Sequence, residues 1–298
     1  MDTQRYAAQH PWGPGPWATR GFDVEGHRGA RGLVVENTIP SFRAAIDVGV
    51  TGVELDVRLT ADGHVVVWHD ATLDPEFCVF GEHDLAGARV DELTLAQLRT
   101  VDVGSRTRPA FPRQRAVPGE RIVTLPELLQ ACSDATDLWW TIELKVDPTE
   151  PREVRTRHTL VEGVLAAVHH AGVGGRCFVH SFDWATLESA RELDPSLLRS
   201  ALAVVGNTYT PGSPWLGGVR YEDFGADLAG AAASIGASVV APHHLTCDAA
   251  FVERAHALGL SVMAWTVNEP ADLERLRDVG VDSIVTDLPD LAVNLLDS

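Results

Sequence analysis

Long apolar runs are missing from this sequence of 298 residues. No stretch approaches the ~20 consecutive uncharged apolar residues that a membrane-spanning helix requires. The first 22 residues lack both a basic flank and an apolar segment, so they do not have the pattern of a secretion signal. Their Trp, Pro and Gly content instead indicates an irregular arm over residues 1–22. We therefore expect a cytoplasmic protein without stable membrane association.

Cysteine is scarce as well. The four cysteines stand far apart in the sequence and none belongs to a CxxC pair, which argues against a disulfide framework and against a structural zinc site. A reducing compartment suits such a pattern, and we expect each cysteine to be a small buried apolar residue. These residues are Cys78, Cys132, Cys177 and Cys247.

Positive charge is the third deficit, because 24 Lys and Arg residues face 42 Asp and Glu residues, for a net charge of −18. A nucleic-acid backbone would be repelled, so nucleic acid is excluded as a partner, and an anionic membrane surface is disfavoured for the same reason. An anionic substrate would need a locally positive site, which a bound divalent cation creates most simply. Acidity also keeps proteins soluble, so charge alone does not establish such a site.

Short apolar runs alternate with longer amphipathic segments along the whole chain. Eight β/α units in a chain of this length predict an α/β fold, a (β/α)8 TIM barrel formed by a single domain over residues 23–298. A Rossmann-type sheet alternates similarly, but no GxGxxG follows the first strand. The expected barrel strands are 23–27, 53–60, 138–146, 176–180, 199–204, 238–241, 261–266 and 282–286. One more short strand is expected at 64–68, after the tight turn at 62–63.

Helices are expected between these strands, with start and stop signals at several ends. The expected ranges are 38–49, 124–133, 157–172, 183–194, 225–236, 248–258 and 270–279, with a last helix from about 290. Residues 70–120 are rich in loops, Pro and Gly and contain one helical segment at 91–101. They have too few apolar residues for a core of their own, so we interpret them as a small insertion after the second strand.

Two predicted strands interrupt their apolar runs with charges at a period of two. Val53, Leu55 and Val57 alternate with Glu54, Asp56 and Arg58. Likewise, Trp140, Ile142, Leu144 and Val146 alternate with Thr141, Glu143 and Lys145. Residues two apart on a strand share a face, ~6.6 Å apart. Since helices cover the outer face of a barrel, these charges are expected to point into the lumen.

Three carboxylates in the lumen, those of Glu54, Asp56 and Glu143, would repel one another unless something neutralises them. A hard divalent cation with oxygen ligands, Mg²⁺ or Ca²⁺, would do so directly. The alternative is that the carboxylates only form salt bridges with the neighbouring cationic side chains. These are Arg28, Arg58 and Lys145.

Two of the 12 histidines, His27 and His69, stand at the predicted carboxyl ends of strands, where barrel enzymes assemble their active sites. Two histidines beside a cation suit proton transfer near neutral pH, one accepting a proton while the other donates one. His169 and His170 end a helix and are expected to be solvated. His243 and His244 follow another strand end, so a contribution to the site stays open there.

These residues, in this order, resemble the glycerophosphodiester phosphodiesterase family of the phospholipase C-like TIM-barrel superfamily. A single short motif would carry no weight, but the ordered set spans most of the chain, with each member at an expected strand end. The matching segments are HRGxxxxxxENTxxSF at 27–42, ELDV at 54–57, DGxxVVxHD at 62–70, TLPELL at 124–129, ELK at 143–145, HSFD at 180–183, WTVN at 265–268 and TD at 286–287. One departure is Val35, where most members have Pro.

The resemblance implies a role for each matching position. Glu54, Asp56 and Glu143 would ligate one divalent cation, and His27 and His69 would be the general acid and base. Arg28 and Lys145 would bind the phosphate, Trp265 would line the pocket for the alcohol, and Glu36 and Asn37 would support the site.

The implied reaction is hydrolysis of a glycerophosphodiester to sn-glycerol 3-phosphate and an alcohol, with water or the adjacent glycerol hydroxyl as the attacking group. Two alternatives remain at this stage. One is a phospholipase D- or C-like enzyme on the same barrel, acting on a lysophospholipid or phosphoinositide; the other is a binding barrel without catalysis. The identity of the metal, the alcohol, the direction of proton flow and the oligomeric state stay open.

Overall fold

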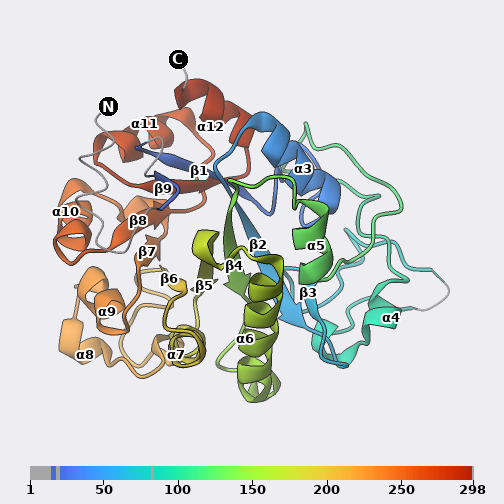
Figure 1. Cartoon of the computed structure of the whole chain (residues 1–298), viewed down its shortest axis with the longest axis horizontal. Coiled ribbons are helices and arrows are strands. Elements are labelled where there is room, and N and C mark those ends of the chain that lie inside the picture. The colour runs from blue at the N-terminus through green and yellow to red at the C-terminus, as the bar shows by residue number, and fades with distance from the viewer. Residues whose placement is uncertain (1–14, 18–20, 82–83, 297–298) are drawn as a thin grey trace.

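The computed structural model describes residues 15–17, 21–81 and 84–296. Eight parallel strands form a barrel in the order β1, β2, β4, β5, β6, β7, β8, β9, and β9 pairs with β1 to close it. Helices surround these strands, as the ring in Figure 1 shows. The predicted (β/α)8 barrel is therefore confirmed. Most of the predicted arm over residues 1–22 lies outside the described residues.

The strands are short, and all but one belong to the barrel. Their bounds are β1 Asp23–His27, β2 Gly52–Leu59, β3 Val65–Val67, β4 Trp139–Leu144, β5 Cys177–Ser181, β6 Leu198–Ala203, β7 Val239–Pro242, β8 Ser261–Ala264 and β9 Ser283–Thr286. The exception is β3, which runs antiparallel to β2 with Val57 opposite Val67. This hairpin reverses the chain, so the residues after β3 come back toward the centre of β2.

The helices follow the predicted alternation. Their bounds are α3 Ile39–Val48, α4 Leu95–Leu98, α5 Leu125–Ala131, α6 Pro151–Ala171, α7 Trp184–Leu193, α8 Tyr221–Phe224, α9 Leu228–Ser234, α10 Ala249–Ala257, α11 Pro270–Asp278 and α12 Pro289–Leu296. Four single-turn 3₁₀ helices are also described: η1 Val90–Glu92, η2 Gly174–Arg176, η3 Pro214–Leu216 and η4 His244–Thr246. None of the described helices is long and apolar enough to cross a membrane.

Two helix predictions are wrong in detail. The helix expected at 225–236 is the shorter α9, and a separate short helix, α8, precedes it and ends at Gly225, which adopts a positive φ of 57°. Asp227 then caps α9 by accepting a hydrogen bond from the Gly230 N–H group. The helix expected from 157 starts earlier, with Pro151 in the first turn of α6, where proline's missing N–H group has no cost.

Two hydrophobic layers hold the barrel together. The outward-facing residues of the strands, such as Leu55 and Ile142, pack against the helices in the main core. Inside the barrel, Phe178 of β5 stacks on Trp17, with ring centroids 5.8 Å apart, within a second apolar cluster that also draws on β6 to β9. The inward face of β1 and β2, and of β4 beyond Trp139, is polar instead. The lumen is thus divided between an apolar half and a half that carries charge.

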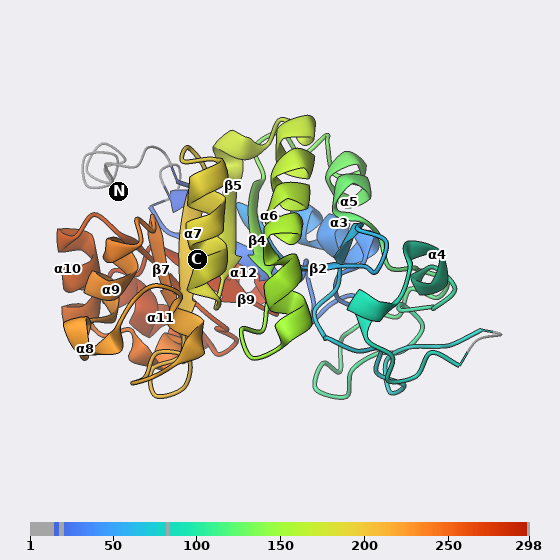
Figure 2. The ribbon, with the colours of Figure 1, turned by 90° about the horizontal axis from the view of Figure 1, so that it is seen from below.

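The segment between β3 and α5 has a hydrophobic cluster of its own, so the expectation that it has too few apolar residues for a core is wrong. Its members include Leu73, Leu98 and Val101, all fully buried, and they pack with Val66 and Trp68 at β3. Figure 2 shows the loops around α4 projecting to one side of the barrel. The prediction failed because these apolar residues are spread through loops, where no periodicity reveals them.

Candidate active site

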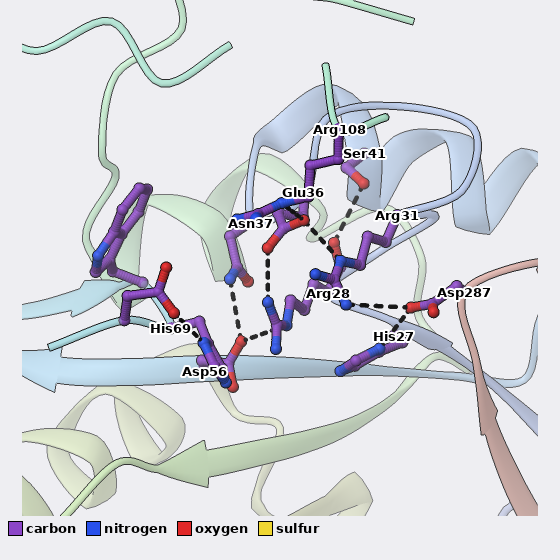
Figure 3. A network of polar contacts seen from close by, with 12 residues as sticks. His27, Arg28, Arg31, Glu36, Asn37, Ser41, Asp56, His69, Arg108 and Asp287 are labelled. Carbon is purple, nitrogen blue, oxygen red and sulfur yellow. Dashed lines mark hydrogen bonds and ion pairs between the residues drawn. The ribbon is translucent and has the colours of Figure 1, made fainter. Parts of the chain in front are cut away.

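Most of the predicted site residues converge at the carboxyl ends of three neighbouring strands, and Figure 3 shows His27, Asp56 and His69 among them. The strand register produces this convergence, because His27 lies opposite Glu54 and Asp56 lies opposite Glu143. Side chains opposite each other on adjacent strands share a face, and here that face is the lumen. His69 reaches the same place by the β2–β3 hairpin, where the preceding Trp68 N–H group donates to the Asp56 carbonyl at 2.9 Å.

Glu54, Asp56 and Glu143 form a buried acidic cluster that could hold a metal ion. One carboxylate oxygen from each lies within 4.8 Å of the others, and Oε1 of Glu54 has no hydrogen-bond partner. Burial, followed by repulsion from the other two carboxylates, raises the pKa of Glu54 well above its usual value. A buried carboxylate oxygen without a donor is costly, and a cation is the partner that such oxygens lack. The cluster therefore fits a divalent cation.

Cationic side chains compensate this cluster only in part. Lys145 Nζ lies 3.0 Å from Asp56 Oδ1 and 2.7 Å from Glu143 Oε1, and Arg28 Nε lies 3.1 Å from Asp56 Oδ2. Although burial raises the pKa of Asp56, these two cations hold it well below its usual value. Arg58 does not join them, because its Nη1 atom pairs with Glu153 at 3.3 Å. Of the three cationic side chains considered for salt bridges with the cluster, Arg28 and Lys145 therefore form them and Arg58 does not.

Each of the two histidines has a carboxylate within hydrogen-bonding distance of its Nδ1 atom. His27 Nδ1 lies 2.6 Å from Asp287 Oδ1, and His69 Nδ1 lies 2.6 Å from Asp70 Oδ1. Such a contact fixes the orientation of the ring and leaves Nε2 for proton transfer. Burial lowers the pKa of His69 more than the neighbouring Asp56 raises it. His27 Nε2 stands 3.7 Å from Glu54 Oε2, which places this ring beside the acidic cluster.

The partner of His27 is itself held in place. Asp287 follows β9, and its Oδ2 atom accepts a hydrogen bond from Asn268 Nδ2 at 2.8 Å, while its N–H group donates to Asn268 Oδ1 at 2.9 Å. Burial raises the pKa of Asp287, but the hydrogen bond and charge of His27 lower it to about 2 overall. The motifs TD and WTVN contain both residues, yet neither was assigned a role from the sequence. The available signal for Asp287 was an acidic residue directly after a strand.

Glu36 accepts hydrogen bonds from three arginines. Arg28 Nη1 reaches its Oε1 atom, and the Nε atoms of Arg31 and Arg108 both reach Oε2, each at 2.6 Å. In Figure 3, Arg28 lies between Glu36 and Asp56. Burial raises the pKa of Glu36, but the three guanidinium groups together lower it. Arg31 and Arg108 were not predicted, because Arg31 occupies an unspecified position of the motif at 27–42 and Arg108 lies in no matching motif.

The short loop after β1 places Arg28 and Asn37 with backbone angles that side chains rarely adopt. Their φ values are 52° and 55°, in the left-handed region. Asn37 Nδ2 donates to Asp56 Oδ2 at 3.1 Å, so this conformation is tied to the acidic cluster. Backbone strain of this kind gathers where a side chain must be held in one place. The predicted supporting position of Asn37 agrees with this contact.

A cavity of about 280 Å³ opens beside the cluster. Its lining includes Glu143, Lys145, His69, Phe182 and Trp215. Trp265, which was predicted to line the pocket, packs its ring against Phe182 with centroids 5.4 Å apart. Its contact with this cavity is therefore through Phe182. Neither Phe182 nor Trp215 was assigned to the site from the sequence.

The closed barrel, with an acidic cluster and two oriented histidines at the carboxyl ends of its strands, has the features of a TIM-barrel enzyme that could hold a metal ion. A model of the glycerophosphoryl diester phosphodiesterase family matches residues 27–291. A glycerophosphodiester phosphodiesterase of Caldanaerobacter subterraneus subsp. tengcongensis is 30% identical over 273 residues, which cover 92% of this chain and 97% of the relative. The chain therefore belongs to the glycerophosphoryl diester phosphodiesterase family, and the predicted enzyme class is confirmed.

Solved structures agree with this assignment. One from Silicibacter pomeroyi DSS-3, provisionally named a glycerophosphoryl diester phosphodiesterase, is 35% identical with a TM-score of 0.83 and covers 93% of each chain. A phosphodiesterase from Oleispira antarctica, solved with the product sn-glycerol-3-phosphate, has a TM-score of 0.71 at 23% identity and covers 93% of this chain and 97% of its own. The latter likeness shows the fold alone.

Proposed function

We propose that this chain hydrolyses glycerophosphodiesters to sn-glycerol 3-phosphate and an alcohol, with one divalent cation and two histidines. The observation that carries the proposal is the meeting of three buried carboxylates with two histidines whose Nδ1 atoms are each held by an aspartate. Family membership supports the reaction class, as does the product bound to the Oleispira antarctica relative.

Glu54, Asp56 and Glu143 are the proposed ligands of the cation, and their oxygen donors suit Mg²⁺ or Ca²⁺. When bound, such a cation offsets negative charge on the phosphoryl oxygens. Arg28 and Lys145 are the proposed phosphate-binding residues, since both already lie at the acidic cluster. Glu36 and Asn37 support them by holding Arg28 and Asp56 in place.

The proton transfers fall to the two histidines. A water molecule, or the adjacent glycerol hydroxyl, attacks phosphorus as one imidazole takes its proton, and the bond from phosphorus to the departing alcohol oxygen breaks as the other imidazole gives that oxygen a proton. Attack by the glycerol hydroxyl leaves a cyclic phosphate, which a water molecule then opens to sn-glycerol 3-phosphate. His69 lines the cavity of about 280 Å³ that can receive the alcohol. We therefore propose His69 as the acid and His27 as the base. Asp70 and Asp287 keep the two rings oriented throughout.

Release of sn-glycerol 3-phosphate from purified protein tests this function. We expect turnover that stops after treatment with a chelator and returns with Mg²⁺ or Ca²⁺. His27→Ala and His69→Ala should each lower kcat by about 10²–10⁴-fold, the usual contribution of a positioned acid or base. His170→Ala, a change at an exposed histidine on α6, is the matched control. Full activity in both site variants would overturn the proposal.

The predictions of a cytoplasmic location and of a small-molecule substrate without nucleic-acid or membrane partners stay predictions. Fractionation of cells that express the chain at its natural level would test the first. Binding to vesicles of anionic lipid, measured by co-sedimentation, would test the second, and a bound fraction would favour the phospholipase-like alternative.

A further inference from the structure

The cavity beside His69 has an aromatic end that the proposed chemistry does not use. Phe182 follows β5 directly, and Trp215 belongs to the single turn η3. Both line the cavity, which Glu143 of the acidic cluster and Lys145 line as well. A diester with its phosphorus at the cluster would therefore extend its departing alcohol toward these two rings.

The two rings form a corner. Their centroids are 6.2 Å apart and their planes meet at 81°. Phe182 is braced on another side by Trp265, at 87° and 5.4 Å, and Trp265 is fixed in turn because its Nε1 atom donates to the Ala241 carbonyl at 2.8 Å. Two nearly perpendicular aromatic walls suit a compact, roughly spherical group that is weakly hydrated. Quaternary ammonium groups have this shape and are attracted to aromatic faces.

The charges that line the cavity favour a cation as well. Arg58 is neutralised by Glu153, and Asp70 accepts from His69. Asp147 differs, because among the described residues only neutral donors are seen at its carboxylate. Its Oδ1 atom accepts from the N–H and hydroxyl groups of Thr149, at 2.8 and 2.7 Å. This carboxylate therefore keeps its charge uncompensated at the cavity wall, where it would attract a cationic headgroup.

We propose that Phe182, Trp215 and Asp147 form a subsite for a quaternary ammonium group on the departing alcohol, so that the preferred substrate is a glycerophosphodiester of a trimethylammonium alcohol. This inference rests on the proposed function for its orientation, since it requires the phosphorus to lie at the acidic cluster. It makes Trp215 and Asp147 specificity-determining residues. Three diesters separate the contributions of shape and charge. The choline diester carries a trimethylammonium group, the ethanolamine diester a primary ammonium group, and the glycerol diester no cation.

The test is a panel of kcat/KM values for glycerophosphocholine, glycerophosphoethanolamine and glycerophosphoglycerol. The wild type should favour the choline diester over the glycerol diester by about tenfold or more, from a cation held by an aromatic face and a carboxylate. Trp215→Leu should remove most of this preference and leave the glycerol diester within about twofold of the wild type, whereas Trp215→Phe should retain most of it. Asp147→Asn should weaken both cationic substrates. Leu245→Ala, at an exposed residue, is the control.

Two results would overturn the subsite. One is equal kcat/KM for the choline and glycerol diesters in the wild type; the other is an equal loss on all three diesters in Trp215→Leu while the folded state is retained. Tetramethylammonium gives an independent readout, because it should compete with the choline diester in the wild type but much less in Trp215→Leu. If the wild type cleaves none of the diesters, the proposed function fails. Saturation-transfer NMR with tetramethylammonium then still decides whether the subsite exists.

Discussion

Arg108 Nε donates a hydrogen bond to Glu36 Oε2 at 2.6 Å, and this contact helps to link the segment between β3 and α5 to the barrel's acidic cluster. The guanidinium group of Arg108 also stacks on the ring of Phe77, with its Cζ atom 3.7 Å from the ring centroid. Glu36 in turn holds Arg28, which reaches Asp56. A residue in a loop-rich segment thus helps to fix a proposed phosphate-binding group.

Arg108→Met should therefore impair the reaction without contact between Arg108 and the reacting atoms. We expect kcat/KM to fall about tenfold, as is usual for outer partners of a site, mainly through a higher KM because Arg28 is less well placed for the phosphate. Arg108→Lys should restore part of the loss but not all, since lysine cannot both stack and donate as the planar guanidinium does. Arg152→Met, at an exposed pair with Glu92, is the control. Unchanged kinetics in Arg108→Met would show that Glu36 is held well enough by its other two arginines.

Asp287→Asn removes the carboxylate from His27 Nδ1 and keeps its shape. The ring would lose the carboxylate that fixes its orientation, so kcat should fall about 10–100-fold. Steady-state kinetics with the choline diester measure this fall. Asp290→Asn, which affects an exposed pair with Arg113, should leave kcat near the wild-type value. An equal fall in both variants would point to lost stability instead.

Binding of the cation should be visible as stabilisation, independently of activity. A ligand that binds only the folded state at 100 times its Kd adds ~2.7 kcal/mol, which for a chain of this size raises Tm by about 5 °C. Differential scanning calorimetry with and without Mg²⁺ or Ca²⁺ would measure this shift.

Glu54→Gln should abolish the shift caused by the cation. Without metal it should raise Tm slightly, because it removes a buried carboxylate that has a raised pKa and an unpartnered oxygen. Glu162→Gln on α6, at an exposed glutamate, should keep the wild-type response. A metal-induced shift of full size in Glu54→Gln would contradict the proposed ligand set.

The pair of His256 and Asp282, which lies outside the site motifs, should make stability depend on pH. Burial lowers the pKa of His256, but the hydrogen bond and charge of Asp282, whose Oδ2 atom is 2.8 Å from Nε2, raise it overall. A raised pKa in the folded state means that the stabilisation is complete below the unfolded pKa of ~6.5 and is lost as pH rises through the folded value.

His256→Gln should accordingly lose stability mainly at low pH. We expect its deficit in free energy of unfolding to be ~1 kcal/mol near about pH 5.5 and smaller near about pH 9. Urea denaturation at both pH values would measure it. His170→Gln should show no such difference between the two conditions. A deficit that grows with pH would reverse the assigned direction of the shift.

The acidic cluster could be predicted because it depends on local periodicity. Charges two apart on β2, and one more on β4, had to face the lumen once a barrel was assumed, and the register of the two strands brought Asp56 opposite Glu143. The positions of His27 and His69 followed from the ends of strands. His69 follows β3, the short strand expected at 64–68, which runs antiparallel to β2 outside the barrel ring.

Contacts between distant segments could not be predicted in this way. Asp287 meets His27 across 260 positions, and Arg108 meets Glu36 across 72. No periodicity within a short window encodes such a partner, because it depends on how loops at different strand ends come together. The same reason explains why Trp215 was not assigned to the pocket and why the cluster around Leu98 was overlooked.

Trp17 and Phe178 meet near the amino-terminal start of β5, at the end of the lumen away from the acidic cluster. The two ends of the barrel therefore have separate roles: the site lies at one end, and apolar packing stabilises the other. Substitutions that improve packing around Trp17 should raise thermal stability while kinetic constants stay unchanged. Thermal stability can thus be engineered around Trp17, and headgroup preference at the carboxyl ends of the strands, without one change disturbing the other.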